Sequence, residues 1–441
     1  MERQRWYKVF KTLKNAWKIP ELKSKLLFTL LIVVLYRLGA NIPVPYVSSD
    51  VGTSLNAMFG GSIFGYLNIL SGNAFANATL FALGVNPYIT ASIVMQLLTI
   101  AIPALERLSK EGEEGRKKIT SYTRYVTVGL GLITSYGYAM LLKANNMLVA
   151  DANTFSIVVI IACYCAGSAL VMWLAEKVND HGIGNGISII LFANIVARGP
   201  AYISSIINTI TSKTGSVGSL ILGIVLAILS VAIFLAIVLV IVWMNDSERR
   251  IPVQYAKRVV GRKMYGGQGT NLPLKLNMTG VMPIIFASSI VSIPATIGSF
   301  FPNSKFWTGV TNAFNYNTWL YVIIELILLV AFAYFYVAIS FNPVEVANNL
   351  KKQGGAIPGI RPGKPTSDYI TRVLNRITLI GAIILAFICV FPMIVNIISK
   401  GSIADLAFSG SSIIIVIGVA LETFRDLEAQ MSLRNYKGFL D

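Results

Sequence analysis

Histidine, cysteine and charge are all scarce in this sequence, and each shortage excludes a class of function. The only histidine is His181, which leaves little material for acid-base or metal chemistry. The three cysteines, Cys163, Cys165 and Cys389, fall inside apolar runs, so neither a disulfide framework nor a metal site is indicated. No GxxxxGK[ST] motif occurs, so we find no P-loop ATP site. We expect no catalytic residue, no metal, no cofactor and no enzymatic activity.

Apolar residues are what the chain has in excess. Of its 441 residues 55% are hydrophobic and 13% are charged, and the mean hydropathy is +0.66. No soluble core needs that much apolar surface, so the composition indicates an integral membrane protein. The first 25 residues contain many lysines and arginines and no continuous apolar run, which is wrong for a cleaved signal peptide.

The apolar residues form ten runs, each near the roughly 20 residues that a helix needs to cross the hydrocarbon. We expect transmembrane helices at Leu22–Gly39, Leu80–Pro103, Tyr125–Leu142, Phe155–Leu174, Gly186–Ile206, Leu220–Met244, Met278–Ile297, Trp319–Phe341, Ile377–Ile398 and Leu406–Leu421. The apolar stretch GGSIFGYLNILSG, residues 60–72, is too short to cross and is bracketed by glycines. It is better interpreted as a re-entrant half-helix, within a segment at 60–74.

Positive charge gives the orientation. Lysines and arginines gather at the ends of the runs on the side of the N-terminus; the exceptions are Arg37, Lys143, Arg198, Lys213, Lys305 and Lys400. This asymmetry predicts that both termini are cytoplasmic. It also accounts for most of the net charge of +17 without a nucleic-acid partner.

One stretch occurs twice. GVNPYITAS at 84–92 returns as GVMPIIFAS at 280–288, which pairs Gly84 with Gly280 and Ile89 with Ile285. A Gly-x-x-Pro loosens the first turn of a membrane helix, and repeated interrupted helices mark where a substrate passes. Five runs in each half place the second copy in the opposite orientation, so we expect two inverted halves, 22–217 and 218–424. Chance similarity between two ordinary helix starts is the alternative.

The two ends of the chain are polar. Trp6, Phe10, Leu13 and Trp17 recur at helical spacing with lysines between them. This pattern in the segment 1–21 indicates an amphipathic helix on an anionic inner leaflet, or equally a helix packed on neighbouring protein. Residues 425–441 are expected to form a cytoplasmic tail.

Two loops on the cytoplasmic side are longer than a connection requires. The loop 245–277 alternates Val253 and Tyr255 before two glycines, which favours a projecting hairpin. The loop 342–376 contains KKQGGAIPGIRPGKPT. Both loops are basic. This pattern is typical of a surface that docks a partner with acidic or phosphate groups, and also of a positive loop that is merely solvated.

Four long motifs carry a family resemblance. They are NPYITASIVMQLL at 86–98, EKVNDHGIGNGISIILFANI at 176–195, NLPLKLNMTGVMPIIFASSI at 271–290 and NPVEVANNLKKQGGAIPGIRPG at 342–363. In order and position they resemble the SecY family, the protein-conducting channels of the bacterial Sec translocon. The resemblance covers essentially the whole chain.

The resemblance implies a pore with two closures. A central ring of aliphatic side chains would fall on Val85, Ile89, Ile187, Leu191, Ile285 and Ile415. A plug that fills the outer funnel would comprise Ile63, Phe64, Tyr66, Leu67, Asn68, Ile69, Leu70 and Ser71, with hinges at Gly60, Gly61 and Gly72. An apolar ring sheds water yet yields around a polypeptide of any sequence. Taken singly, each aliphatic side chain is more simply a lipid-facing or core residue.

The resemblance also implies a lateral gate between the second and seventh spans, and partners for the loops. The gate would include Thr90, Ser92, Gln96, Ser288, Ser289, Ser292 and Ile293. Its hydroxyls could instead bond their own helices. The SecA motor and the ribosome would meet Arg249, Arg250, Lys257, Arg258, Arg262, Lys263, Lys351, Lys352, Arg361 and Lys364. Further implied partners are SecE- and SecG-like subunits, preproteins with signal peptides, and anionic lipids at a bacterial plasma membrane.

Glu325 is a departure that the resemblance does not explain. It lies inside the run Trp319–Phe341, where a charge costs roughly 2.5 to 3.5 kcal/mol unless it is partnered or protonated. A secondary transporter also has inverted repeats, but it usually carries several such groups, whereas Glu325 stands nearly alone. An intramembrane protease would need a nucleophile with a base, or paired aspartates, within the spans.

Overall fold

The computed structural model describes residues 14–437 apart from 49, 60–62, 150–152, 212–216, 256–257, 261–262, 266–268, 299–300, 302–303, 316–317 and 400–409. In this part of the chain six helices are long and apolar enough to cross a membrane. There is a seventh span if α5 (Asn86–Ala101) and α6 (Pro103–Lys110), which meet at 101°, count as one. Each of the ten predicted runs overlaps at least one described helix.

The chain divides into two compact units. Unit 1 comprises Met1–Ala227, Ser289–Tyr321 and Ile415–Asp441; unit 2 comprises Ile228–Ser288 and Val322–Ile414. The helices of unit 1, besides α5 and α6, are α2 (Pro20–Gly39), α3 (Val51–Phe59), α4 (Ile63–Leu70), α7 (Glu113–Ala144), α8 (Thr154–His181), α9 (Gly186–Val196), α10 (Gly199–Thr211) and α13 (Lys305–Ala313). Helices that belong partly to each unit are α11 (Val217–Asp246), α12 (Met282–Gly298), α14 (Trp319–Ser340) and α17 (Gly410–Lys437).

Aromatic side chains and small residues hold unit 1 together. Tyr138 of α7 and Tyr164 of α8 meet edge to face at 5.1 Å, and the buried Tyr138 hydroxyl donates to the backbone oxygen of Phe75. At Gly167 of α8 a Cβ would lie 2.0 Å from the backbone oxygen of Leu80. Because only glycine permits this approach, α8 packs directly on the backbone before α5.

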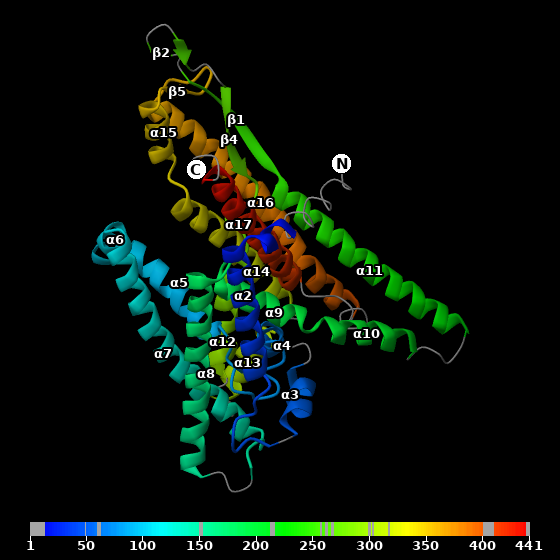
Figure 1. The fold of residues 1–441 in the computed structure, drawn as a ribbon. Helices are drawn as coiled ribbons and strands as arrows, with labels where there is room; N and C mark the ends of the chain where they lie inside the picture. Colours follow the sequence, from blue (N-terminus) through cyan, green and yellow to red (C-terminus); the bar gives the residue numbers. More distant parts are fainter. Residues whose placement is uncertain are drawn as a thin grey trace. The chain divides into compact units, whose positions relative to one another are not determined.

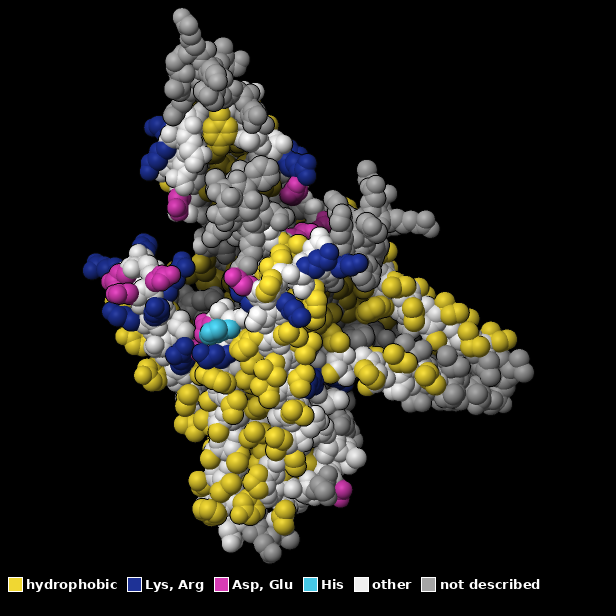
Figure 2. Space-filling view, viewed as in Figure 1, with side chains coloured by type: hydrophobic (Ala, Val, Ile, Leu, Met, Phe, Trp, Pro, Cys, Tyr) yellow, Lys and Arg dark blue, Asp and Glu magenta, His cyan; other side chains and the backbone are white. Residues whose placement is uncertain are grey.

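The surface of unit 1 has the two environments that a membrane demands. Figure 2 shows hydrophobic side chains over α2, α7 and α8, and Lys and Arg gathered at α6 and the first turns of α7. Tyr125 is 75% exposed and Phe155 is 70% exposed. Exposed apolar area of this kind is stable only against lipid or another protein.

Unit 2 contains the two long basic loops, which fold together. In the first, β1 (Glu248–Tyr255) pairs antiparallel with β4 (Gly269–Lys275), and between them β2 (Arg258–Val260) pairs with β3 (Lys263–Tyr265). In the second, α15 (Pro343–Lys352) precedes β5 (Gly355–Ala356), which joins the other edge of β1, and α16 (Lys364–Ser399) follows. Figure 1 shows β5 and α15 beside β1. The predicted hairpin is confirmed.

Strand alternation explains this arrangement. Ile251 and Val253 point inward from β1 and are buried with Leu274 of β4, while Pro252 between them and Gln254 after them are exposed. The inward side chains pack on residues of the second loop, Leu350, Ile357 and Ile370. Residues 248–275 and 343–376 therefore share one small core, and we call them the basic platform.

Several helices extend beyond the predicted runs. α16 begins at Lys364 rather than near Ile377, and α17 continues to Lys437 through most of the expected tail. Hydropathy marks only the apolar part of a helix, whereas backbone hydrogen bonding continues into polar sequence. The run Leu80–Pro103 shows the opposite difference, because residues 80–85 form turns and the helix begins at Asn86.

Only the last part of the N-terminal segment is described. Ala16 is buried with Leu22, Ile183 and Leu427 of the same unit, whereas Trp17 is 52% exposed. One face of the described turn therefore packs on protein and the other is free to meet a different surface.

Candidate functional site

The two copies of the repeated stretch share one backbone conformation. Gly84 has a φ of +53° and Gly280 a φ of +63°, in the left-handed region that other residues avoid. In each copy the helix begins two residues later, and the repeat proline, Pro87 or Pro283, lies in its first turn, where a missing N–H costs least. The repeat is thus a matched helix start in three dimensions, which chance similarity does not require.

A cavity of about 220 Å³ lies between α5, α7, Leu67 of α4 and the second part of α12, all within unit 1. Four of the predicted gate residues line it, namely Thr90, Ser289, Ser292 and Ile293. Ser92 and Gln96 are half-buried on α5 and are not among its lining residues. Sequence reasoning missed the wall from α7, which includes Leu130, Ile133 and Thr134. In sequence α7 looks like any apolar span, so nothing there indicated this role.

Two of the gate hydroxyls, those of Thr90 and Ser292, bond their own helices. Thr90 donates to the backbone oxygen of Asn86 at 3.0 Å, and Ser292 donates to that of Ser289 at 2.7 Å. This was the alternative considered for them, and it leaves the cavity with a largely apolar lining. Neither of these two hydroxyls joins α5 to α12. A helix with apolar side chains can therefore enter the cavity without breaking a hydrogen bond between α5 and α12 at either hydroxyl.

Ser288 belongs to unit 2 and faces Glu325. Its hydroxyl lies 2.8 Å from the backbone oxygen of Ile284 and 3.4 Å from Oε1 of Glu325, and the Cys389 thiol lies 3.4 Å from the same Oε1. Glu325 is 1% exposed. The intramembrane acid therefore has polar contacts, which is one of the two conditions under which we expected it to be tolerated.

The predicted ring residues are inward-facing. Val85, Ile89, Leu191, Ile285 and Ile415 are each at most 4% exposed, and Ile187 is half-buried. Lipid-facing positions are excluded for the five buried ones. Val85 directly precedes α5, Ile89 lies in it, Ile187 and Leu191 lie in α9, Ile285 in α12 and Ile415 in α17. Ile285 belongs to unit 2 and the others to unit 1, and the ring itself stays a prediction.

The predicted half-helix is present as α4. Its C-terminal end is fixed by Asn68, which accepts from the backbone N–H of Ala76, and by Ser71, which accepts from that of Phe75. Gly72 follows with a φ of +64°, as a hinge requires. Gly60 and Gly61 lie outside the described residues, as do the side chains of Ile63, Phe64 and Tyr66.

The basic platform presents charge to solvent. Arg249, Arg250, Lys351, Lys352, Arg361 and Lys364 are all exposed. Arg250 is paired with Glu248 at 2.7 Å, and the backbone oxygen of Arg361 accepts from the Thr366 hydroxyl, which ties this turn to α16. Lys257 and Arg262 lie outside the described residues, as do the side chains of Arg258 and Lys263.

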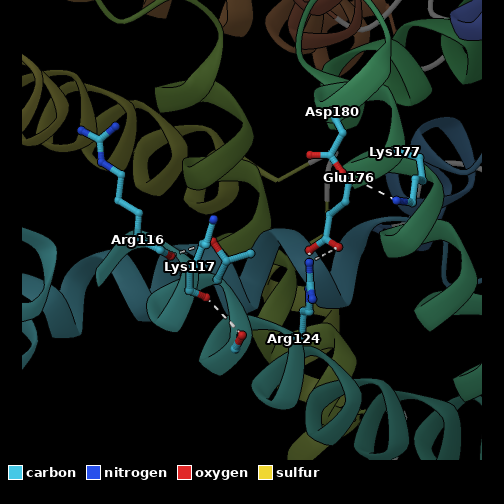
Figure 3. Close-up of polar contacts among 8 residues, drawn as sticks. Arg116, Lys117, Arg124, Glu176, Lys177 and Asp180 are labelled. Carbon is cyan, nitrogen blue, oxygen red and sulfur yellow. Dashed lines mark hydrogen bonds and ion pairs between the residues drawn. The ribbon is translucent and has the colours of Figure 1, made fainter. Parts of the chain in front are cut away.

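An ion pair joins α7 and α8 near their polar ends. Figure 3 shows Arg124 of α7 directed at Glu176 of α8, while Arg116 points away. Both contacts are 2.9 Å, Nε to Oε1 and Nη2 to Oε2, which is the bidentate geometry that guanidinium and carboxylate favour. The pair and the packing of α7 on α8 hold these two helices together, and α7 in turn lines the cavity.

A second space within unit 1 is an apolar groove of about 610 Å³ between α2, α9 and α17. Leu30, Val33, Phe192 and Phe424 line it, and Arg37 lies at its edge. Sequence reasoning did not predict the groove, because its walls come from distant parts of the chain. Within the described residues no group of three or more His, Cys, Asp or Glu could hold a metal ion.

Comparisons with known proteins agree on one family. The SecY family model matches residues 79–424. The protein translocase subunits SecY of Streptomyces galbus and Streptomyces coelicolor are 43% and 44% identical, each over 97% of this chain and 98% of theirs. That of Mycobacterium tuberculosis is 42% identical over 97% of this chain and 98% of its own.

Solved structures share the fold. One, of a protein-conducting channel, has a TM-score of 0.64 at 18% identity and covers 93% of this chain and 92% of its own. Another, Sec61 in a canine ribosome-channel complex from the endoplasmic reticulum, has a TM-score of 0.60 at 16% identity with the same coverage. The predicted fold class, an all-α multi-pass membrane protein, is confirmed. From the length and identity of these matches it follows that the chain belongs to the SecY family of protein translocase subunits.

Proposed function

We propose that the chain passes unfolded secretory polypeptides across the bacterial plasma membrane and releases signal and transmembrane helices sideways into the lipid. As a member of the SecY family it is the protein-conducting channel subunit of the Sec translocase and not an enzyme. The cavity between α5 and α12 is the observation that carries the lateral part of the proposal. Residues from both repeat-bearing helices line it, and those helices are the proposed walls of the gate.

The proposed pore closes at an apolar ring. Val85, Ile89, Ile187, Leu191, Ile285 and Ile415 would shed water at rest and yield to a chain of any sequence. Their burial supports this assignment. The half-helix α4 and Ser71 would fill the outer side as a plug, and the hinge at Gly72 supports that movement. The division into inverted halves, 22–217 and 218–424, belongs to the same proposal.

The basic platform is the proposed dock for the SecA motor and the ribosome. Its charge is exposed, and a buried apolar core supports it. A rigid, positively charged surface is what an acidic protein or ribosomal RNA requires.

Smaller partners are proposed for the apolar surfaces. The groove between α2, α9 and α17 supports binding of a transmembrane helix from a SecE- or SecG-like subunit. The basic N-terminal segment would meet anionic lipid, with both termini cytoplasmic.

The proposal is tested by reconstitution with the motor, the small subunits, ATP and a radiolabelled preprotein. Protease-protected preprotein should accumulate inside proteoliposomes, and the Arg361→Glu variant should not support it. Equal protection in liposomes without the chain contradicts the proposal. Uptake of a small solute coupled to an ion gradient, without preprotein transport, would support the secondary-transporter alternative.

A further inference from the structure

Three distant segments meet at the C-terminal end of α4. They are the end of α2 with Tyr36 and Arg37, the end of α4 with Leu70, and α9 with Asn194. Asn194 is 0% exposed and lies in α9, where Ser188 is the only other polar side chain. A buried amide in such a place is costly unless its hydrogens are used.

Both hydrogens of the Asn194 amide are used. Nδ2 donates to the backbone oxygen of Leu70 at 2.7 Å and to the hydroxyl oxygen of Tyr36 at 2.9 Å. A carbonyl oxygen can only accept, so the amide nitrogen must face Leu70, and this fixes the orientation of the side chain. The last carbonyls of a helix lack donors within the helix. Asn194 therefore caps α4 from a different helix.

Arg37 and Gly72 complete the contact. Nη2 of Arg37 donates to the backbone oxygen of Ala193 at 2.5 Å, which fastens α2 to α9 beside Asn194. At Gly72 a Cβ would lie 2.7 Å from Nη1 of Arg37 and 3.1 Å from Oδ1 of Asn194. The φ of Gly72, +64°, also favours glycine. The close approach of Arg37 and the left-handed backbone are therefore two independent reasons for a glycine at this position.

We propose that Asn194, supported by Tyr36 and Arg37, is a latch that holds α4 in its closed position. The proposal rests on the assignment of α4 as the plug. Outward movement of α4 breaks the bond from Asn194 to Leu70 and leaves a buried donor without its acceptor. If Asn194 loses these hydrogen bonds, and each has the ordinary net strength, the ratio of closed to open α4 should fall about tenfold. Asn194 is thus a positioning residue for gating.

The test measures exposure of α4 in the full-length, cysteine-free chain, reconstituted with its partner subunits. A cysteine replaces Ile69, which is half-buried, and its rate of reaction with a membrane-impermeant maleimide is divided by that of a cysteine replacing the exposed Val149. Asn194→Leu keeps the size and removes both donors, so this ratio should rise about tenfold. Tyr36→Phe removes one acceptor and should raise it about threefold. Asn153→Asp, at an exposed cap without a side-chain hydrogen bond, should leave it unchanged.

A parallel arm separates the latch from the plug. Deleting residues 63–71 should raise the resting ion conductance of planar bilayers. An unchanged labelling ratio in Asn194→Leu overturns the latch, whatever the deletion does. A raised ratio with unchanged conductance after the deletion supports the latch contact and refutes the plug. If Asn194→Leu fails to fold, Tyr36→Phe decides, since it removes a single oxygen atom.

Discussion

The substitutions Gly84→Ala and Gly280→Ala should lower the free energy of unfolding by the same amount, because both glycines have the same backbone conformation. Gly84 and Gly280 have φ values of +53° and +63°. A Cβ at Gly280 would meet nothing within 4 Å, and one at Gly84 would meet only ordinary contacts at 3.9 Å. Space is therefore available at both, and the cost is the left-handed backbone alone, about 1 to 2 kcal/mol for each substitution.

Alanine substitutions at two other glycines should change the free energy of unfolding in ways that bound this cost from below and above. Gly129 of α7 is exposed and has no neighbour within 4 Å, so Gly129→Ala should stabilise by about 0.5 to 1 kcal/mol through helix propensity. Gly167→Ala would place Cβ 2.0 Å from a backbone oxygen and should cost more than either repeat substitution.

Thermal unfolding of the purified variants in one detergent, followed by circular dichroism, gives the order of midpoints. We expect Gly129→Ala highest, then the unchanged chain, then Gly84→Ala and Gly280→Ala close together, then Gly167→Ala. Repeat variants as stable as the unchanged chain would refute the left-handed helix start. A loss at only one of them would refute the structural match between the copies.

Three further perturbations test separate parts of the account. Arg361→Glu should abolish motor-stimulated translocation while membrane insertion stays normal, and equal stimulation in proteoliposomes would remove the platform as the dock. Ile89→Ser together with Ile285→Ser should raise resting conductance because the ring then holds water; unchanged single-channel currents would refute the ring. Glu325→Gln keeps the shape and meets Ser288 and Cys389 as a neutral amide, so its thermal midpoint should equal or exceed that of the unchanged chain. A clear fall would show that a carboxylic acid is required at that position.

Much of the architecture can be predicted from the sequence because a helix that crosses a membrane must be apolar over a fixed length. A transmembrane helix needs about 20 apolar residues, as in the run Trp319–Phe341, and the helix α14 occupies almost the same range. Alternation at Val253 and Tyr255 predicts the hairpin, because one face of a strand is buried; Val253 is buried and Gln254 between them is exposed. Gly84 and Gly280 were found through the repeat, and their backbone explains why glycine recurs.

The remaining features depend on contacts between distant residues. Asn194 lies in a span with no local sign that Leu70 and Tyr36 would meet its amide. Ile133 of α7 lines the cavity because α7 packs on α5, and hydropathy carries no information about that neighbour. Pairing of β5 with β1 joins two loops about 100 residues apart, which strand propensity alone does not specify.

The most direct test of the account is a disulfide across the cavity between α5 and α12. Thr90 and Ile293 both line it, and a disulfide forms only when the alpha carbons come within about 7 Å. In a cysteine-free chain with Thr90→Cys and Ile293→Cys, mild oxidation should form the bridge and stop preprotein transport, and reduction should restore it. A bridge that forms readily while preprotein still crosses at the normal rate would contradict the lateral gate.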